Sequence, residues 1–144
     1  MSRGKRIIVL SAASGCMWAL IATLLGWLAF GRPVLGGIIA SPFIGLAAGY
    51  SSRFFPSTGR VKRAIFALVS LCIAACLFGA SIGAFAVLTG ELSGNDVYQH
   101  PSDVLIETTL ASLFGMILGP YVLLLWPLSY ANHSIVSKLW TESG

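Results

Sequence analysis

The sequence predicts an all-α integral membrane protein, a bundle of four transmembrane helices with both chain termini in the cytoplasm. Four long apolar stretches, residues 7–30, 33–50, 64–88 and 104–130, alternate with short polar loops. Charged residues make up 10% of the 144 residues, against about 25% in a typical soluble domain. Because about 20 apolar residues cross a bilayer as a helix, each stretch predicts one crossing. We therefore expect a single transmembrane domain over residues 1–144.

The basic residues predict which loops face the cytoplasm. Eight of the nine Lys and Arg residues lie before the first stretch, between the second and third, or after the fourth. The loop after the first stretch holds only Arg32, and the loop after the third holds acidic residues without Lys or Arg. Since basic loops stay in the cytoplasm, both termini and residues 51–63 are expected there. Basic residues confined to helix ends also argue against nucleic acid as a partner.

The first two stretches differ in character. Residues 7–30 are uniformly apolar and long enough to cross the bilayer at a tilt. A lipoprotein signal ending at Cys16 is the alternative for this segment, but no polar tether follows the cysteine. Residues 33–50 contain four glycines and Pro42, which predict a bent or locally unwound helix buried among the others. A re-entrant segment at this place would break the charge pattern.

The third and fourth stretches complete the bundle. Residues 64–88 follow a basic turn and are rich in small side chains. Residues 104–130 carry Pro120 and Pro127, and we expect this helix to bend toward its cytoplasmic end. After it, residues 133–141 predict a short helix at the membrane interface. Its apolar stripe consists of Ile135, Val136, Leu139 and Trp140.

Small residues recur at four-residue spacing in three of the stretches, the GxxxG pattern. They are Gly45 and Gly49, then Ala75, Gly79 and Gly83, and finally Gly115 and Gly119. On a helix such residues share one face and let a partner backbone approach closely. We therefore assign them to helix packing, either within one chain or between chains.

A polar group at the start of the fourth stretch is the clearest candidate for chemistry. His100, Asp103 and Glu107 have a spacing that could place a carboxylate pair and an imidazole around a divalent ion. The same residues equally suit a solvated acidic cap, since carboxylates are favourable near a helix N-terminus. We treat them as a possible outer polar site, and we expect neither a bound metal nor a cofactor.

Catalytic machinery is not visible in the sequence. The middle thirds of the four stretches contain no Asp, Glu, Lys, Arg or His, the groups that coupled transporters place within the membrane. Cys72 and Cys76 are four residues apart on one helix face, where a disulfide seldom forms. The chain is therefore predicted not to be an enzyme.

One segment carries a resemblance to known proteins. Gly45-Leu-Ala-Ala-Gly49-Tyr50-Ser-Ser-Arg53, followed by a basic turn, resembles small uncharacterised bacterial inner-membrane proteins with four helices. The segment is also similar to the Gly-rich, Arg-ended helix of fluoride channels, but residues 64–88 lack the Thr- and Phe-rich signature of that family. We expect a multi-pass protein of the cell membrane, with the bacterial inner membrane preferred because targeting motifs for other compartments are missing from the sequence.

Two functions fit these observations. The first is a non-enzymatic structural, assembly or regulatory subunit that lies in the lipid bilayer and associates with other membrane proteins, or with itself, through the small-residue faces. The alternative is a small oligomeric channel or uncoupled transporter around the second stretch, with Glu107 attracting cations at the outer mouth. A redox protein or an enzyme that uses the cysteines or His100 is a third class.

Overall fold

The computed structural model describes residues 3–30, 32–90, 100–119 and 121–141, and these residues form helices and turns without strands. The elements are α1 (Arg3–Phe30), α2 (Val34–Ser51), the 3₁₀ helix η1 (Ser52–Phe54), α3 (Arg60–Thr89), α4 (Pro101–Leu118) and α5 (Tyr121–Thr141). The first four α-helices are long and apolar enough to cross a membrane. The all-α class and the number of candidate crossings are thus confirmed.

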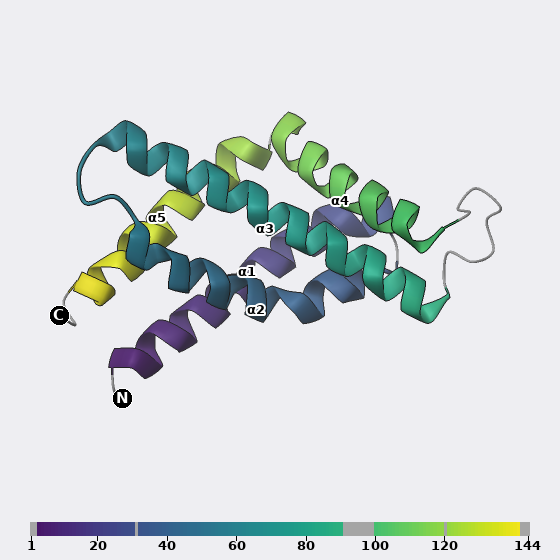
Figure 1. Cartoon of the computed structure of the whole chain (residues 1–144), viewed down its shortest axis with the longest axis horizontal. Helices are drawn as coiled ribbons and strands as arrows, with labels where there is room; N and C mark the ends of the chain where they lie inside the picture. The colour runs from purple at the N-terminus through teal and green to yellow at the C-terminus, as the bar shows by residue number, and fades with distance from the viewer. Residues whose placement is uncertain (1–2, 31, 91–99, 120, 142–144) are drawn as a thin grey trace.

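The helices lie side by side, with the start of α1, the turn between α2 and α3, and the end of α5 at one end of the bundle (Figure 1). Helix α1 packs chiefly on α2, and α3 packs on both α2 and α4. We name this end of the bundle the basic end after the cationic residues that the structure describes there. They are Lys5, Arg6, Arg53, Arg60, Lys62, Arg63 and Lys138.

Helix α2 is uninterrupted through its internal proline, so of the two expected forms, a bent or a locally unwound helix, the unwound one is excluded. Pro42 lacks the N–H that would pair with the Ile38 carbonyl oxygen, four residues earlier. The hydroxyl of Ser41 replaces this donor, because Ser41 Oγ donates to the same oxygen at 2.7 Å. A local side-chain hydrogen bond therefore keeps the helix intact over the whole of Val34–Ser51.

The fourth predicted helix, residues 104–130, is two helices in the structure. Helix α4 ends at Leu118, and α5 begins at Tyr121. Gly119 between them has φ −82° and ψ 160°, an extended conformation. The residue before a proline is driven out of the helical region by the proline ring, and residue 120 is a proline. The proline at position 120, which was expected to bend a single helix, thus marks the boundary between two helices.

The separate interfacial helix predicted at residues 133–141 is also corrected, because these residues form the second half of α5. Its expected apolar stripe is divided: Val136 is buried in the bundle, whereas Ile135 is exposed. At the end of the helix, Trp140 Nε1 donates to the Gly49 carbonyl oxygen at 3.1 Å. The tail of α5 is therefore attached to the end of α2, and the helix packs against α3, η1 and α1.

Candidate functional site

A cavity of about 370 Å³ lies at the centre of the bundle, and all five α-helices of the described residues contribute to its wall. Its volume is in the range of about 300 to 1,000 Å³ that is usual for small-molecule sites. Small side chains create the space. They are Gly15, Ala22, Gly45, Ala48, Ala74, Ala75, Ala111 and Gly115.

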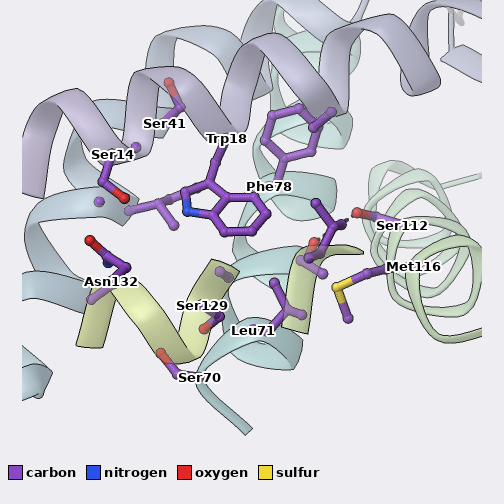
Figure 2. Close-up of a pocket in the computed structure, with 18 of the residues that line it drawn as sticks. Ser14, Trp18, Ser41, Ser70, Leu71, Phe78, Ser112, Met116, Ser129 and Asn132 are labelled. Atoms are coloured by element: carbon purple, nitrogen blue, oxygen red, sulfur yellow. Dashed lines mark hydrogen bonds between the residues drawn. The ribbon is translucent and has the colours of Figure 1, made fainter. Parts of the chain in front are cut away.

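Large apolar side chains close the cavity between these small residues. The indole of Trp18 lies across the middle, and Phe78 lies on the side of α3 nearest α2 (Figure 2). Leu71, Met116 and Leu125 pack together where α3 meets the junction between α4 and α5. The break at Gly119 therefore contributes to the site, because it lets α4 and α5 supply one wall residue each to this cluster.

Several hydroxyl groups in the wall are already paired with the backbone. Ser112 donates to the Ala75 carbonyl oxygen at 2.8 Å, which ties α4 to α3. Ser129 donates to the Ala67 carbonyl oxygen at 3.1 Å, which ties α5 to α3. Since each of these hydroxyls has its single proton engaged, they hold helices together and offer only an acceptor oxygen to the cavity.

Three other polar groups in the wall have no such pairing. The Ser14 hydroxyl, the Trp18 indole N–H and the Asn132 amide form no hydrogen bond with another side chain or backbone group in the described parts of the chain. In Figure 2 the indole nitrogen of Trp18 is on the side of the ring where Ser14 and Asn132 lie. The cavity thus has a polar pole, defined by these three residues, while the other polar side chains of its described wall are hydrogen-bonded within the bundle.

His133 belongs to the same wall and is 1% exposed. Its Nδ1 lies 2.7 Å from Ser52 Oγ, and its Nε2 lies 2.8 Å from Ser70 Oγ. Because Ser52 donates its own proton to the Ala48 carbonyl oxygen, its oxygen accepts from Nδ1–H, and Nε2 then accepts from the Ser70 hydroxyl. Both ring nitrogens of His133 are thus hydrogen-bonded while the imidazole is neutral.

The surroundings of His133 keep this neutral form. The imidazole stacks on the Phe55 ring at 5.8 Å between centroids and meets the edge of the Phe66 ring at 5.2 Å. Burial lowers the pKa of His133 to about 4 from the ordinary 6.5, because an imidazolium would lose its hydration there. His133 therefore joins α5 to η1 and α3 as an uncharged, hydrogen-bonded side chain.

The Ser70–His133 pair has the spacing of a nucleophile and its general base, but the rest of a catalytic site is missing from the described residues. The group on the far side of the imidazole is the Ser52 hydroxyl, which cannot balance the charge of an imidazolium as a carboxylate does. Ser70 lies inside α3, where backbone N–H groups are used by the helix and leave no oxyanion donors. The arrangement supports packing rather than acyl transfer.

The predicted outer polar site does not assemble into a cluster in the described residues. His100, Asp103 and Glu107 are all exposed near the start of α4, and Ser102 Oγ contacts Asp103 Oδ1 at 3.5 Å. No group of three metal-binding side chains comes together in the described ranges. The remaining acidic residues of this loop, Glu91 and Asp96, lie outside the described residues.

The residues assigned to helix packing fall into two groups. Gly45 and Gly49 lie against Ser11 and Gly15 of α1, so closely that a Cβ on either would overlap them. Gly79 and Gly83 lie equally close to Thr108 and its neighbours on α4, and Ala75 accepts the hydrogen bond from Ser112. Gly115 differs: a Cβ there would meet no described atom within 4 Å, and the residue lines the cavity. Gly119 is the extended residue between α4 and α5.

Sequence reasoning missed the polar pole and His133. Both carry weak signals, because Ser14 and Trp18 are four residues apart on α1, and Ser129, Asn132 and His133 share one face of α5. Uncharged polar residues on one helix face are the pattern that could have identified this site. Charged groups within the apolar stretches are the usual sign of a functional site in a membrane protein, and the part of the cavity wall that the structure describes has no Asp, Glu, Lys or Arg.

These features define an all-helical bundle with four helices long and apolar enough to cross a membrane, which suggests a multi-pass membrane protein, and with a neutral cavity at its centre. Comparisons with protein-family models, curated proteins and solved structures found no match.

Proposed function

We propose that this chain is a non-enzymatic, multi-pass membrane protein that binds an uncharged, largely apolar small molecule in its central cavity. The observation that carries the proposal is the polar pole of Ser14, Trp18 and Asn132, three side chains without hydrogen-bond partners in the described residues that face a cavity of about 370 Å³. These three side chains are partly buried, and a ligand in the cavity that pairs with them gains hydrogen bonds that fix its orientation.

The charges in the wall support an uncharged ligand. Among the described residues that line the cavity there is no Asp, Glu, Lys or Arg, and His133 is neutral. An ion entering this space would lose its hydration without a countercharge. The same absence gives little support to the channel alternative, which needs rings of charges or carbonyl oxygens along a path.

Native mass spectrometry of the intact protein, released from mild detergent or nanodiscs, tests the proposal. We expect a bound neutral species with the mass of a lipid-soluble compound. The variant Ala75→Phe should lose it, because Ala75 is a half-buried residue of α3 that lines the cavity, and a ring at this position takes up part of the cavity volume. The matched control is Ile117→Phe on the exposed face of α4, which should retain the ligand. An empty wild-type protein, or equal occupancy in both variants, would refute the proposal.

The orientation we propose places the basic end in the cytoplasm, and with it both termini. The concentration of Lys and Arg at that end supports it, as does the pairing of Arg53 with the rings of Tyr50 and Trp140, which favour the headgroup level. The bacterial inner membrane is the location we propose. In a Cys-free background, an impermeant thiol reagent added to intact cells should label Ser102→Cys and spare Ser57→Cys; the reverse pattern would overturn the orientation.

A subunit role is the second candidate, and one observation favours it. Helix α4 has an open small-residue position at Gly115, flanked by the exposed side chains of Phe114 and Leu118. A helix of another membrane protein, or of a second copy, could approach closely there. If a second copy is the partner, crosslinking between single cysteines at position 114 in membranes should yield a dimer. If the partner is a different membrane protein, it should be pulled down with the wild type and lost in Gly115→Phe.

A further inference from the structure

A second hollow, of about 240 Å³, lies between α2 and α3 beside the central cavity. Part of its lining faces outward: Val69, Ile73 and Leu77 of α3 are exposed, as is Ala47 of α2. These side chains lie in the middle portions of two candidate membrane crossings. In a bilayer, this hollow therefore opens toward the lipid chains.

The two hollows share part of their lining. Among the described residues, Ile44, Ala48, Ser70 and Ala74 line both of them, so these four side chains form the partition that the central cavity and the outward-facing hollow share. Three of the four are small, and Ile44 is the one large side chain in this partition. A rotamer change at a single isoleucine is a fast and inexpensive motion compared with separation of two helices.

The helices are fixed on both sides of this partition. Toward the opposite end from the basic end, Gly36 of α2 packs against the backbone of Ser81 of α3 closely enough to exclude a Cβ, and the Phe78 ring of α3 lies on Gly37. Toward the basic end, His133 bridges Ser52, which follows α2, to Ser70 of α3. The gap between α2 and α3 is thus held at both ends by these contacts, and we name this gap the window.

We propose that this window is a lateral portal, through which an uncharged lipid-soluble molecule passes between the bilayer and the central cavity, with Ile44 as the side chain that moves. The inference rests on the function proposed above and names the ligand more closely. At the polar pole, the Trp18 indole can only donate a hydrogen bond, so the ligand carries at least one acceptor oxygen. Its class is an uncharged, largely apolar compound with a hydroxyl, ester or ketone oxygen.

A photoreactive long-chain alcohol with a diazirine in its chain is a suitable probe. The protein is reconstituted in phosphatidylcholine vesicles, the probe is added, and labelling of peptides containing Trp18 or Met116 is followed with time by mass spectrometry. The variant Ala47→Phe fills the outer hollow without touching the central cavity, since Ala47 lines only the former. The variant Ile44→Ala removes the large side chain of the partition.

The portal predicts changes in rate. Labelling of the cavity should slow by about fivefold or more in Ala47→Phe and should quicken by a similar factor in Ile44→Ala, because the barrier to entry changes. The final extent of labelling in Ala47→Phe should match the wild type. Matched controls are Ile65→Phe and Ile39→Ala, exposed positions on the same two helices that line neither hollow, and both should keep the wild-type rate.

Two contrary results are distinguishable. If the cavity is labelled at one rate in all variants, the portal is wrong and the binding site stands. If the wild-type cavity is not labelled even when the probe and the protein are mixed in detergent micelles, where entry from a bilayer is not required, the proposed function itself fails. Circular dichroism of each purified variant shows whether the bundle has folded.

Discussion

Two glycines in the bundle predict opposite effects of the same substitution. At Gly45, the atoms that a Cβ would meet are backbone atoms, the Ser11 carbonyl oxygen and the Gly15 Cα, so rotation of a side chain cannot relieve the overlap. Gly45→Ala should therefore destabilise the protein by about 1 to 3 kcal/mol, the usual cost of overpacking. At Gly115, where no described atom lies within 4 Å, Ala should stabilise α4 by about 0.5 to 1 kcal/mol through its higher helix propensity.

The assay is reversible unfolding by sodium dodecyl sulfate in mixed micelles, followed by circular dichroism. The two alanine variants should differ by roughly 2 to 4 kcal/mol in their free energy of unfolding, with the wild type between them. Gly36→Ala, which would meet the Ser81 carbonyl oxygen and Phe85, should behave like Gly45→Ala. If Gly45→Ala were as stable as Gly115→Ala, the close contact between α1 and α2 would be wrong.

Three further predictions concern the hydrogen bonds of the bundle. Ser41→Ala should cost about 1 to 3 kcal/mol by leaving the partly buried Ile38 carbonyl oxygen unpaired. Adding Pro42→Ala should recover most of that loss because the new N–H replaces the hydroxyl; a double-mutant cycle in the same assay that shows additivity would contradict this. Because the pKa of His133 falls to about 4 in the fold from 6.5 in the unfolded chain, its contribution is complete above about pH 6.5 and is lost as the pH falls toward 4, by up to about 3 kcal/mol. Unfolding curves for His133→Gln should lack this pH dependence, and parallel curves for variant and wild type would disprove the assignment. Trp140→Phe removes the 3.1 Å hydrogen bond to the α2 backbone and should raise amide hydrogen exchange at the end of α5; unchanged exchange would show that this attachment is not needed.

Local sequence rules succeeded where the deciding interaction was also local. The first three predicted helices match α1, α2 and α3 to within a few residues, because an apolar stretch of this length has a helix as its favourable state in lipid. The division at Gly119 was present in the sequence as a proline, but whether a proline bends a helix or ends it depends on how the next segment of the chain packs. Helix α5 extends through residues 133–141 in contact with the bundle, because Val136 is buried and Trp140 donates a hydrogen bond to the backbone of α2.

The candidate site was less accessible to sequence reasoning. Four-residue spacing places Gly45, Gly79 and Gly115 on helix faces, but it does not tell what lies opposite each face. The structure brings backbone against the first two and leaves open space beside the third. Ser14 and Asn132, from the first and last helices, come to the same cavity through contacts that join distant parts of the chain.

By itself, the sequence determined an all-α chain with four candidate crossings and the basic residues that collect at one end, since hydrophobic length and charge placement act on each segment independently. Only the tertiary structure decided that the small residues enclose a cavity, that three uncharged polar groups face it, and that Ile44 stands between it and the outer surface of the bundle. The physical reason is that the shape of a cavity depends on how several helices pack together. Each of the five α-helices contributes only part of the wall, so no single segment of the sequence determines the cavity.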